Sequence, residues 1–192
     1  IVGGGPTGVE MAGAVAEIGR KTMIPDFPLL KPEDIRVILV EAVDKVLMPY
    51  PEKLSEYTKK ALEDLGVEVH LSNPVTNITG EGVETEKEFI ETKNIFWAAG
   101  NEAPPILKSL DTEMDKAGRV LVNRDCSIPS DPNVFVIGDA AAHYDDSGNL
   151  LPGVAPVAMQ QGKYVAKIIK DKVAAAKRPP FQYRDKGSMA TI

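Results

Sequence analysis

The sequence predicts an α/β protein that begins with a parallel sheet covered on both faces. Short apolar stretches alternate with helix-compatible stretches over the first 100 residues. The apolar stretches are residues 1–2, 35–41, 67–71 and 95–98, and the helix-compatible ones are residues 9–19 and 51–66. Because parallel strands need a crossover connection, usually a helix, this alternation favours a parallel sheet.

Composition narrows the classes of function. The chain has 192 residues, enough for one large domain or two small ones, and a net charge of −6, which argues against a basic nucleic-acid-binding surface. No apolar run approaches the roughly 18 residues of a membrane span. Cys126 is the single cysteine, so no internal disulfide is expected, and His70 and His143 give no metal-ligand spacing.

A glycine-rich turn follows the first apolar residues. Gly3, Gly5 and Gly8 match the pattern G-x-G-x-x-G, with Pro6 and Thr7 inside it. The first glycine permits a tight turn from strand to helix, the second lets a diphosphate approach the backbone, and the third lets the helix pack closely on the strand. The start of the helix then offers free N–H groups to the phosphates. These five residues therefore form the predicted dinucleotide turn of a Rossmann-like domain.

An acidic residue, Glu41, ends the second apolar stretch. At this place in a dinucleotide site, a carboxylate accepts hydrogen bonds from the adenosine ribose and disfavours a 2′-phosphate, so it favours NAD over NADP. Glu41 follows Gly8 by 33 residues, whereas the usual spacing is about 20. Residues 20–34 explain the excess, because their three prolines indicate an inserted loop. The alternative is a solvated carboxylate at a strand end.

The remaining elements of the first 100 residues follow from periodicity and turn residues. Residues 51–66 predict an amphipathic helix that ends at Gly66. Its expected buried side consists of Leu54, Tyr57, Ala61, Leu62 and Leu65. Residues 75–91 indicate short strands with turns at Gly80 and Gly82, and residues 95–98 predict a fully buried strand.

A second ligand-binding pattern lies in the C-terminal half. Residues 118–123 and 133–137 are expected strands, and the second breaks sharply at Gly138 and Asp139. Gly138 permits close approach to the backbone, and Asp139 can accept a hydrogen bond from a polyol hydroxyl. Residues 155–173 predict a helix that ends before Pro179 and Pro180. The residues expected on one face of this helix are Val157, Gln161, Tyr164, Val165 and Ile168.

Several segments together resemble the type II NADH dehydrogenases, single-subunit NADH:quinone oxidoreductases. They are the first glycine turn, FWAAG, VFVIGDAA, LPGVAPVAMQQG and the final FQYRDKGSMATI. The resemblance implies a Rossmann-like NADH-binding domain at residues 1–104 and the C-terminal part of a split FAD-binding domain at residues 105–192. It also implies that the N-terminal FAD half and a C-terminal membrane-surface segment lie outside this chain. The parent enzyme would work in a respiratory chain, peripheral on the cytoplasmic face of the membrane.

The resemblance assigns roles in passing a hydride from NADH to FAD and electrons on to a quinone. The glycine turn would hold the NADH diphosphate and Glu41 the ribose, with Ala99 and Gly100 beside the nicotinamide. The residues expected to bind FAD are Gly138, Asp139 and Ala155. In such chemistry the cofactors react, and the protein supplies alignment and exclusion of water.

Four further residues match family positions near the reacting rings or the quinone. Glu10 corresponds to a carboxylate near nicotinamide and flavin, although it equally suits the dipole of a helix's first turn. Gln160 and Gln161 are candidates for quinone contact, because Pro156 stands where family members often have glutamine. Lys186 matches a lysine near the flavin, and its alternative is a solvated lysine.

Other functions stay open at this point. A ferredoxin-type, rubredoxin-type or disulfide reductase shares both ligand patterns, but a disulfide reductase needs a cysteine pair, and this chain has Cys126 alone. The chain by itself could also be a nucleotide-binding module that binds NADH and holds little flavin, because it lacks a glycine turn for FAD. Residues 134–138 would then present an unpaired edge, so that residues 105–192 are poorly ordered or pair with a second copy.

Overall fold

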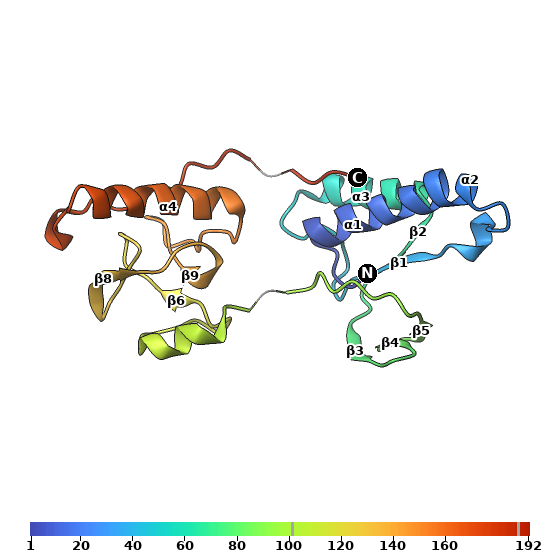
Figure 1. The fold of residues 1–192 in the computed structure, drawn as a ribbon, viewed down its shortest axis with the longest axis horizontal. Helices are drawn as coiled ribbons and strands as arrows, with labels where there is room; N and C mark the ends of the chain where they lie inside the picture. Colours follow the sequence, from blue (N-terminus) through green and yellow to red (C-terminus); the bar gives the residue numbers. More distant parts are fainter. Residues whose placement is uncertain (101, 188) are drawn as a thin grey trace. The chain divides into compact units, whose positions relative to one another are not determined.

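The computed structural model describes residues 1–100, 102–187 and 189–192 (Figure 1). The chain divides into two compact units. The first comprises Ile1–Gly100 together with Met189–Ile192, and the second is Asn101–Ser188. Each unit has a hydrophobic core of its own.

A parallel sheet forms the centre of the first unit, as expected. Strands β1 (Val37–Val40) and β2 (Val67–His70) pair in parallel. Val2 bridges in parallel to Val40 on one side and to Trp97 on the other, so the spatial order is Trp97, Val2, β1, β2. The carboxyl ends of these strands meet at one edge of the sheet, where ligands bind in open α/β folds.

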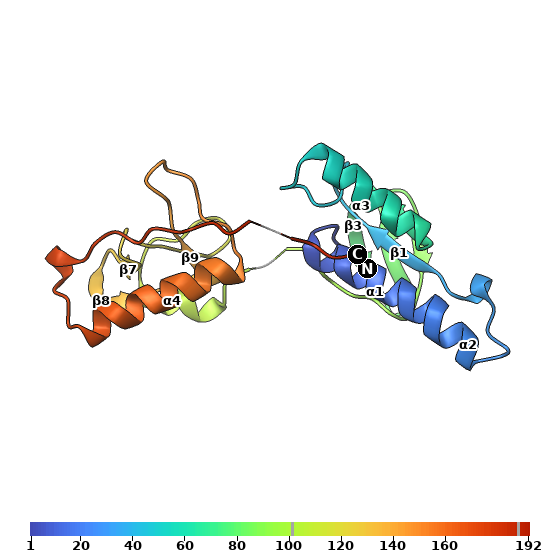
Figure 2. The same ribbon diagram turned by 90° about the horizontal axis from the view of Figure 1, so that it is seen from above.

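Two helices cover one face of this sheet, as Figures 1 and 2 show. Helix α1 (Pro6–Glu17) packs on β1, and α3 (Glu52–Asp64) packs on β2. α1 continues through a π-helical turn, Ile18–Met23, into the short α2 (Ile24–Asp26), so the loop expected from residue 20 begins only after Asp26. The hydrogen bonding changes from α-helical to π-helical just before Pro25, which lacks the N–H that a regular helix needs at this position.

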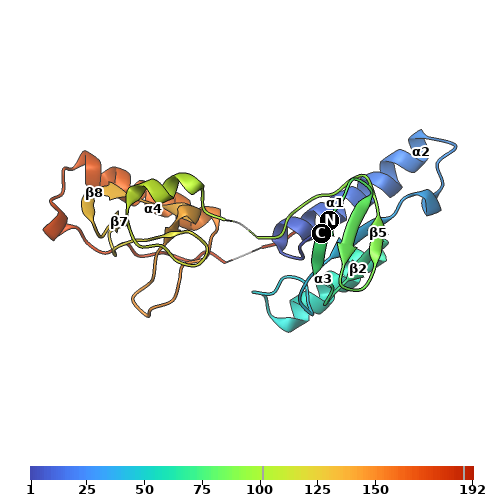
Figure 3. The same cartoon turned by 90° about the horizontal axis from the view of Figure 1, so that it is seen from below.

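The other face of the sheet is covered by strands, so both faces are covered as expected, one by helices and the other by a meander. Strands β3 (Val75–Ile78), β4 (Gly82–Thr85) and β5 (Phe89–Glu91) form an antiparallel meander opposite the helices (Figure 3). The expectation that residues 95–98 are fully buried is also wrong, because Phe96 is 43% and Trp97 58% exposed. Trp97 lies at the edge of the described sheet, where one side is open.

The core of the first unit lies between the helices and the sheet. Its fully buried residues include Val9, Ala12, Leu39 and Leu62. The predicted buried side of α3 is confirmed for Leu62, which is fully buried, and for Leu65, which packs against the core. It is wrong for Leu54 and Tyr57, which are exposed, and Ser55 and Thr58 are buried instead. Ser55 turns inward because its hydroxyl donates to the carbonyl oxygen of Val46 at 2.7 Å.

The second unit combines short strand pairs with one long helix. Strand β6 (Val120–Leu121) pairs in parallel with β9 (Ala141–Ala142), and β7 (Ser127–Ile128) pairs antiparallel with β8 (Asp131–Phe135). Helix α4 spans Ala155–Lys170, and Val157, Gln161, Val165 and Ile168 form its buried face, as predicted. Short 3-10 helices complete the described structure. One lies in the first unit, at Pro32–Asp34, and the others lie in the second, at Pro105–Leu110, Gly138–Ala140 and Ala175–Lys177.

Two boundaries in the second unit differ from expectation. The expected strand 133–137 is replaced by β8, which ends at Phe135 and belongs to a hairpin with β7. α4 ends at Lys170, well before Pro179, because the chain turns through a left-handed conformation at Lys172, with φ +49°. Among the described residues, no helix is both long and apolar enough to cross a bilayer.

Candidate functional site

The glycine turn connects Val2 to α1, and packing explains two of its three glycines. Gly3 has φ +106°, which favours glycine, and a Cβ there would lie 2.8 Å from the carbonyl carbon of Ala98. A Cβ on Gly8 would lie 1.8 Å from the carbonyl oxygen of Gly3. Neither position can carry a side chain in this fold, so both glycines are required by the strand-to-helix turn itself.

Gly5 is different, because a Cβ at this position would meet no protein atom within 4 Å. Gly5 is the N-cap of α1, and the helix has no side-chain cap there. The uncapped start leaves N–H groups at the positive end of the helix dipole for an anion. Pro6 and Thr7, the next two residues, are exposed. The structure thus brings an open surface and unused donors together at the expected diphosphate position.

Glu41 lies against the same turn. One carboxylate oxygen accepts the N–H of Gly4 at 2.5 Å, and the other accepts the N–H of Val43 at 3.1 Å. These bonds fix the carboxylate at the carboxyl edge of the sheet, directly beside the start of α1. Glu41 is held there rather than extending freely into solvent.

The loop after Trp97 completes this end of the first unit. Ala98 contacts Gly3, and Ala98 N–H donates to the carbonyl oxygen of Val2 at 2.8 Å. Ala99 lines a pocket of 140 Å³ together with Gly3 and Glu41. Gly100 has φ +71° and open space around it. Gly3, Glu41 and Ala99 therefore line one pocket at the carboxyl edge of the sheet.

Glu10 has a defined partner within the first unit. It is the fifth residue of α1 and therefore stands beyond the first turn, which corrects the helix-dipole interpretation. Its Oε1 accepts the backbone N–H of Thr191 at 3.1 Å. Ile192 packs close to Gly13 on the same helix. Glu10 thus holds the Met189–Ile192 segment against α1.

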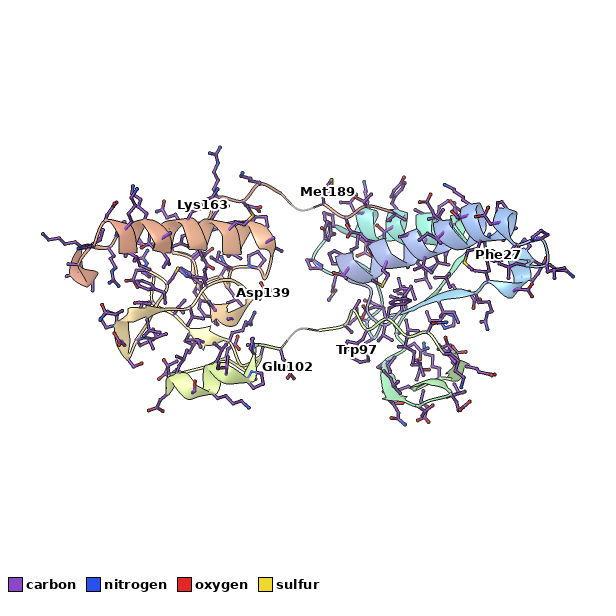
Figure 4. All side chains as sticks on the ribbon, viewed as in Figure 1. Phe27, Trp97, Glu102, Asp139, Lys163 and Met189 are labelled. Atoms are coloured by element: carbon purple, nitrogen blue, oxygen red, sulfur yellow. The ribbon has the colours of Figure 1, made fainter. Side chains whose placement is uncertain are left out.

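The second unit carries its own pocket, of 320 Å³, around Gly138 and Asp139. Gly138 has φ +65°, and a Cβ there would lie 3.2 Å from the Cβ of Ala158. Asp139 is exposed beneath the N-terminal end of α4 (Figure 4), and this end has no side-chain cap. Ala155, the first residue of α4, is exposed as well. Asp139 and Val157 line the pocket, so it has a carboxylate acceptor and part of the first turn of α4 in its wall, whereas Ala155 lies outside it.

The two glutamines of α4 have structural partners. The Oε1 of Gln161 accepts the N–H of Gly138 at 2.7 Å, and Gln161 is buried at the wall of the pocket. Gln160 pairs with the backbone of Arg184, donating to its carbonyl oxygen and accepting its N–H, each at 3.0 Å. Gln161 therefore fixes the Gly138 turn, and Gln160 fixes the segment that leads to Lys186. Lys186 itself is exposed.

Cys126 and His143 are buried in contact with each other, with 3.6 Å between Sγ and Nδ1. Burial raises the pKa of the Cys126 thiol to about 12, with a smaller contribution from the neighbouring Asp125 carboxylate. Burial also lowers the pKa of His143. At neutral pH the cysteine is therefore a protonated thiol, which is a poor nucleophile.

Sequence reasoning assigned no role to Asn73, which lines the pocket of the first unit, or to Glu102, Arg119 and His143, which line the pocket of the second. Asn73 could have been found, because it follows β2 at the carboxyl edge of the sheet, where ligands of parallel sheets bind. His143 gave no comparable signal, because a single histidine after a short strand is most often a core residue.

Comparison with known proteins shows what this chain is similar to. The type II NADH:quinone oxidoreductase Ndh of Mycobacterium tuberculosis is 43% identical over 204 residues, covering 100% of this chain and 43% of that protein. The internal alternative NAD(P)H-ubiquinone oxidoreductase A1 of Arabidopsis thaliana is 32% identical, covering 100% of this chain and 40% of that protein. The chain thus spans less than half the length of these relatives.

Solved structures share the fold. The NDH2 structure from Plasmodium falciparum in complex with NADH aligns over 100% of this chain and 55% of its own, with a TM-score of 0.85 at 17% identity. The resemblance to type II NADH dehydrogenases and the Rossmann-like α/β fold are confirmed by these matches. The family model for pyridine nucleotide-disulphide oxidoreductases matches residues 1–162. The chain therefore belongs to the pyridine nucleotide-disulphide oxidoreductase family.

Proposed function

We propose that the first unit binds the dinucleotide NADH, with its diphosphate at the start of α1 and its adenosine ribose at Glu41. The proposal rests on Gly5. Packing accounts for Gly3 and Gly8, whereas no protein atom requires a glycine at position 5. A ligand that approaches the backbone closely does require one. The carboxylate of Glu41, fixed beside the turn, favours ribose hydroxyls over a 2′-phosphate.

We propose that residues 1–104 are an NADH-binding domain and that residues 105–192, which include most of the second unit and also the Met189–Ile192 segment of the first, are the C-terminal part of an FAD-binding domain. The exposed Asp139 and the uncapped start of α4 at Ala155 would bind the flavin cofactor, and Gln161 would hold the Gly138 turn in place for it. When bound, FAD would supply the redox chemistry, accepting a hydride from NADH and passing the electrons to a second substrate. The residues of this chain bind and orient the cofactors.

For the whole protein, we propose an NADH:quinone oxidoreductase of the respiratory chain. The names of the relatives from Mycobacterium tuberculosis and Arabidopsis thaliana support quinone as the electron acceptor. Because quinones are apolar, a peripheral position on the cytoplasmic membrane surface suits this activity. The contacts of Gln160 and Gln161 with the backbone favour positioning roles for these residues over direct quinone contact.

For the chain by itself, the second candidate is a nucleotide-binding module without redox activity. For the whole protein, it is a reductase that acts on another acceptor. A disulfide-reductase mechanism through Cys126 is disfavoured, because the thiol is buried and has a raised pKa.

The matched variants Gly5→Ala and Gly80→Ala test NADH binding. A Cβ meets no protein atom within 4 Å at either position, so neither variant should alter folding stability. The added methyl at position 5 obstructs the diphosphate, so we expect the NADH Kd of Gly5→Ala to rise about tenfold or more, a loss of about 1.4 kcal/mol. Gly80→Ala, in the turn between β3 and β4, should bind as the wild type does.

Binding is measured by quenching of Trp97, the single tryptophan, which lines the pocket beside Gly3. Equal Kd values for the two variants would contradict the assignment of the diphosphate to the turn. Absence of saturable NADH binding by the wild-type chain would contradict the proposed function of the first unit.

A further inference from the structure

Positive charge is concentrated in the last part of the second unit. Residues 155–187 carry eight lysine and arginine side chains and two aspartates, a net charge of +6, although the whole chain has a net charge of −6. The remaining residues therefore carry −12. A basic segment in an otherwise acidic protein indicates an anionic partner.

Most of these basic side chains have no acidic partner. Arg178 pairs with Asp125, but the other seven are exposed and form no ion pair within the described part of the chain. These seven are Lys163, Lys167, Lys170, Lys172, Lys177, Arg184 and Lys186. Helix α3 is the contrast, because its Lys59 and Lys60 pair with acids one turn further along. The positive charge of the second unit is therefore available to a partner.

Helical geometry places part of this charge on the outer face of α4. Met159, Lys163 and Lys170 lie within about 40° of one another around the helix axis, opposite the buried face. Lys167 and Ile169 flank them, and Met159 and Ile169 are 62% and 61% exposed. Figure 4 shows Lys163 on the side of α4 that faces away from the strands. We call these five residues the basic face of α4.

We propose that the basic face of α4 binds an anionic membrane surface, with its lysines among the lipid headgroups. Clusters of lysine on one face of an amphipathic helix are typical of attachment to anionic lipids. Because α4 buries its apolar side inside the protein, this attachment is electrostatic, and Met159 and Ile169 add apolar contact. The choice of a membrane rests on the proposed function. The basic face is separate from the membrane-surface segment that the resemblance places outside this chain.

The chemistry of the basic face favours a membrane over the acidic surface of a second copy. Protein partners often hold carboxylates through arginine, whose planar guanidinium bonds them bidentately. The basic face has three lysines and no arginine. Lysines are point charges on flexible stems, which mobile headgroups can follow. Each lysine near an anionic surface strengthens binding about fivefold.

The test compares two kinds of vesicle by cosedimentation with the full chain. One contains about one-third phosphatidylglycerol, which is anionic, and the other is pure phosphatidylcholine. We expect binding to the anionic vesicles alone. Raising the salt concentration from about 0.1 M to about 1 M should weaken it at least about tenfold, because the screening length falls from about 10 Å to about 3 Å.

Two triple variants locate the binding surface. Neutralising the basic face by Lys163→Gln, Lys167→Gln and Lys170→Gln should weaken vesicle binding about a hundredfold. The corresponding arginine substitutions should keep it, which separates lost charge from any change in folding. The matched control removes the same number of charges from exposed positions without a described ion pair. It consists of Lys31→Gln, Lys53→Gln and Lys108→Gln, and should bind nearly as the wild type does.

Each other outcome overturns a defined claim. Equal binding to the two kinds of vesicle, or equal weakening in the two glutamine variants, overturns the membrane assignment and leaves the NADH proposal standing. Salt-sensitive dimers that form without vesicle binding, and that the α4 glutamine variant abolishes, assign the basic face to a second copy and overturn it as well. Quenching of Trp97 by NADH, measured on the same preparation, tests the proposed function separately.

Discussion

Replacing Arg178 by methionine should destabilise the second unit far more than the removal of an exposed arginine does. The Arg178 side chain is 7% exposed and forms an ion pair with Asp125 at 3.0 Å. It also donates to the carbonyl oxygens of Pro132 and Val173, and its guanidinium lies 4.9 Å from the ring centre of Phe135. One side chain therefore connects the segment after α4 to the β7–β8 hairpin.

The size of the effect follows from what the substitution leaves behind. Removing one partner of a buried ion pair typically costs about 3–5 kcal/mol, because the other charge stays buried. Asp125 is 15% exposed and keeps two hydrogen bonds from Ser127, so part of that cost is avoided. We expect Arg178→Met to lower the free energy of unfolding of the second unit by about 3 kcal/mol, the low end of that range.

The effect should depend on pH in a defined direction. Burial opposes ionisation of Asp125, but hydrogen bonds from Ser127 and Arg178 outweigh it and hold the pKa of this carboxyl below its usual value. A lowered pKa in the folded state contributes stability that is present above the unfolded pKa of about 3.9 and is lost as the pH falls through the folded value. The difference between wild type and Arg178→Met should therefore shrink below about pH 4.

The assay is urea unfolding followed by circular dichroism at pH 7 and pH 3, with hydrogen exchange in α4 identifying the transition of the second unit. Arg124→Met is the matched control, because Arg124 pairs with Asp146 on the surface, where the two side chains are 65% and 57% exposed. Such pairs contribute about 0–1 kcal/mol. Equal losses in the two variants, or a loss in Arg178→Met that is undiminished at pH 3, would refute this reasoning.

Two further predictions concern the site residues. Glu41→Gln removes the charge that repels a 2′-phosphate but keeps an oxygen for the Gly4 N–H, so the ratio of NADPH to NADH Kd should fall about tenfold in titrations; an unchanged ratio would remove Glu41 from cofactor selection. Gln160→Leu breaks both bonds to the Arg184 backbone, so trypsin should cleave after Arg184 about tenfold faster, whereas the exposed Gln182→Leu serves as a control that leaves the rate unchanged.

Periodicity predicted the elements that bury an apolar stripe. The buried face of α4 was predicted almost completely, because Val157, Val165 and Ile168 recur at helical spacing. The same reasoning was right for Leu62 of α3 but wrong for Leu54 and Tyr57, because the buried side includes Ser55 and Thr58 instead. The Ser55 hydroxyl is stable inside the protein because it donates to the carbonyl oxygen of Val46, which lies nine residues earlier and outside the helix. Hydropathy therefore cannot show which side of such a helix faces inward.

The candidate site was predictable to the extent that it depends on local backbone geometry. The glycine turn and Glu41 were found, because a strand-to-helix turn and the acid after the next strand follow from chain order alone. The contact between Glu10 and Thr191 could not be predicted from the sequence, because it joins residues 181 positions apart. The unpaired oxygen of Asn73 was equally hidden, since it depends on which neighbours are absent in the folded chain.

The two glutamines of α4 show why a motif position and a chemical role have to be separated. Each amide already forms a hydrogen bond of 3.0 Å or less with the backbone, one at Gly138 and one at Arg184. A quinone oxygen accepts hydrogen bonds, so at Gln160 it would compete with the carbonyl oxygen of Arg184 for Nε2 and leave that carbonyl without a partner. At Gln161 the engaged atom is Oε1, which holds the Gly138 turn and cannot donate to a quinone oxygen. Each glutamine therefore has a positioning role that its place in the motif does not reveal.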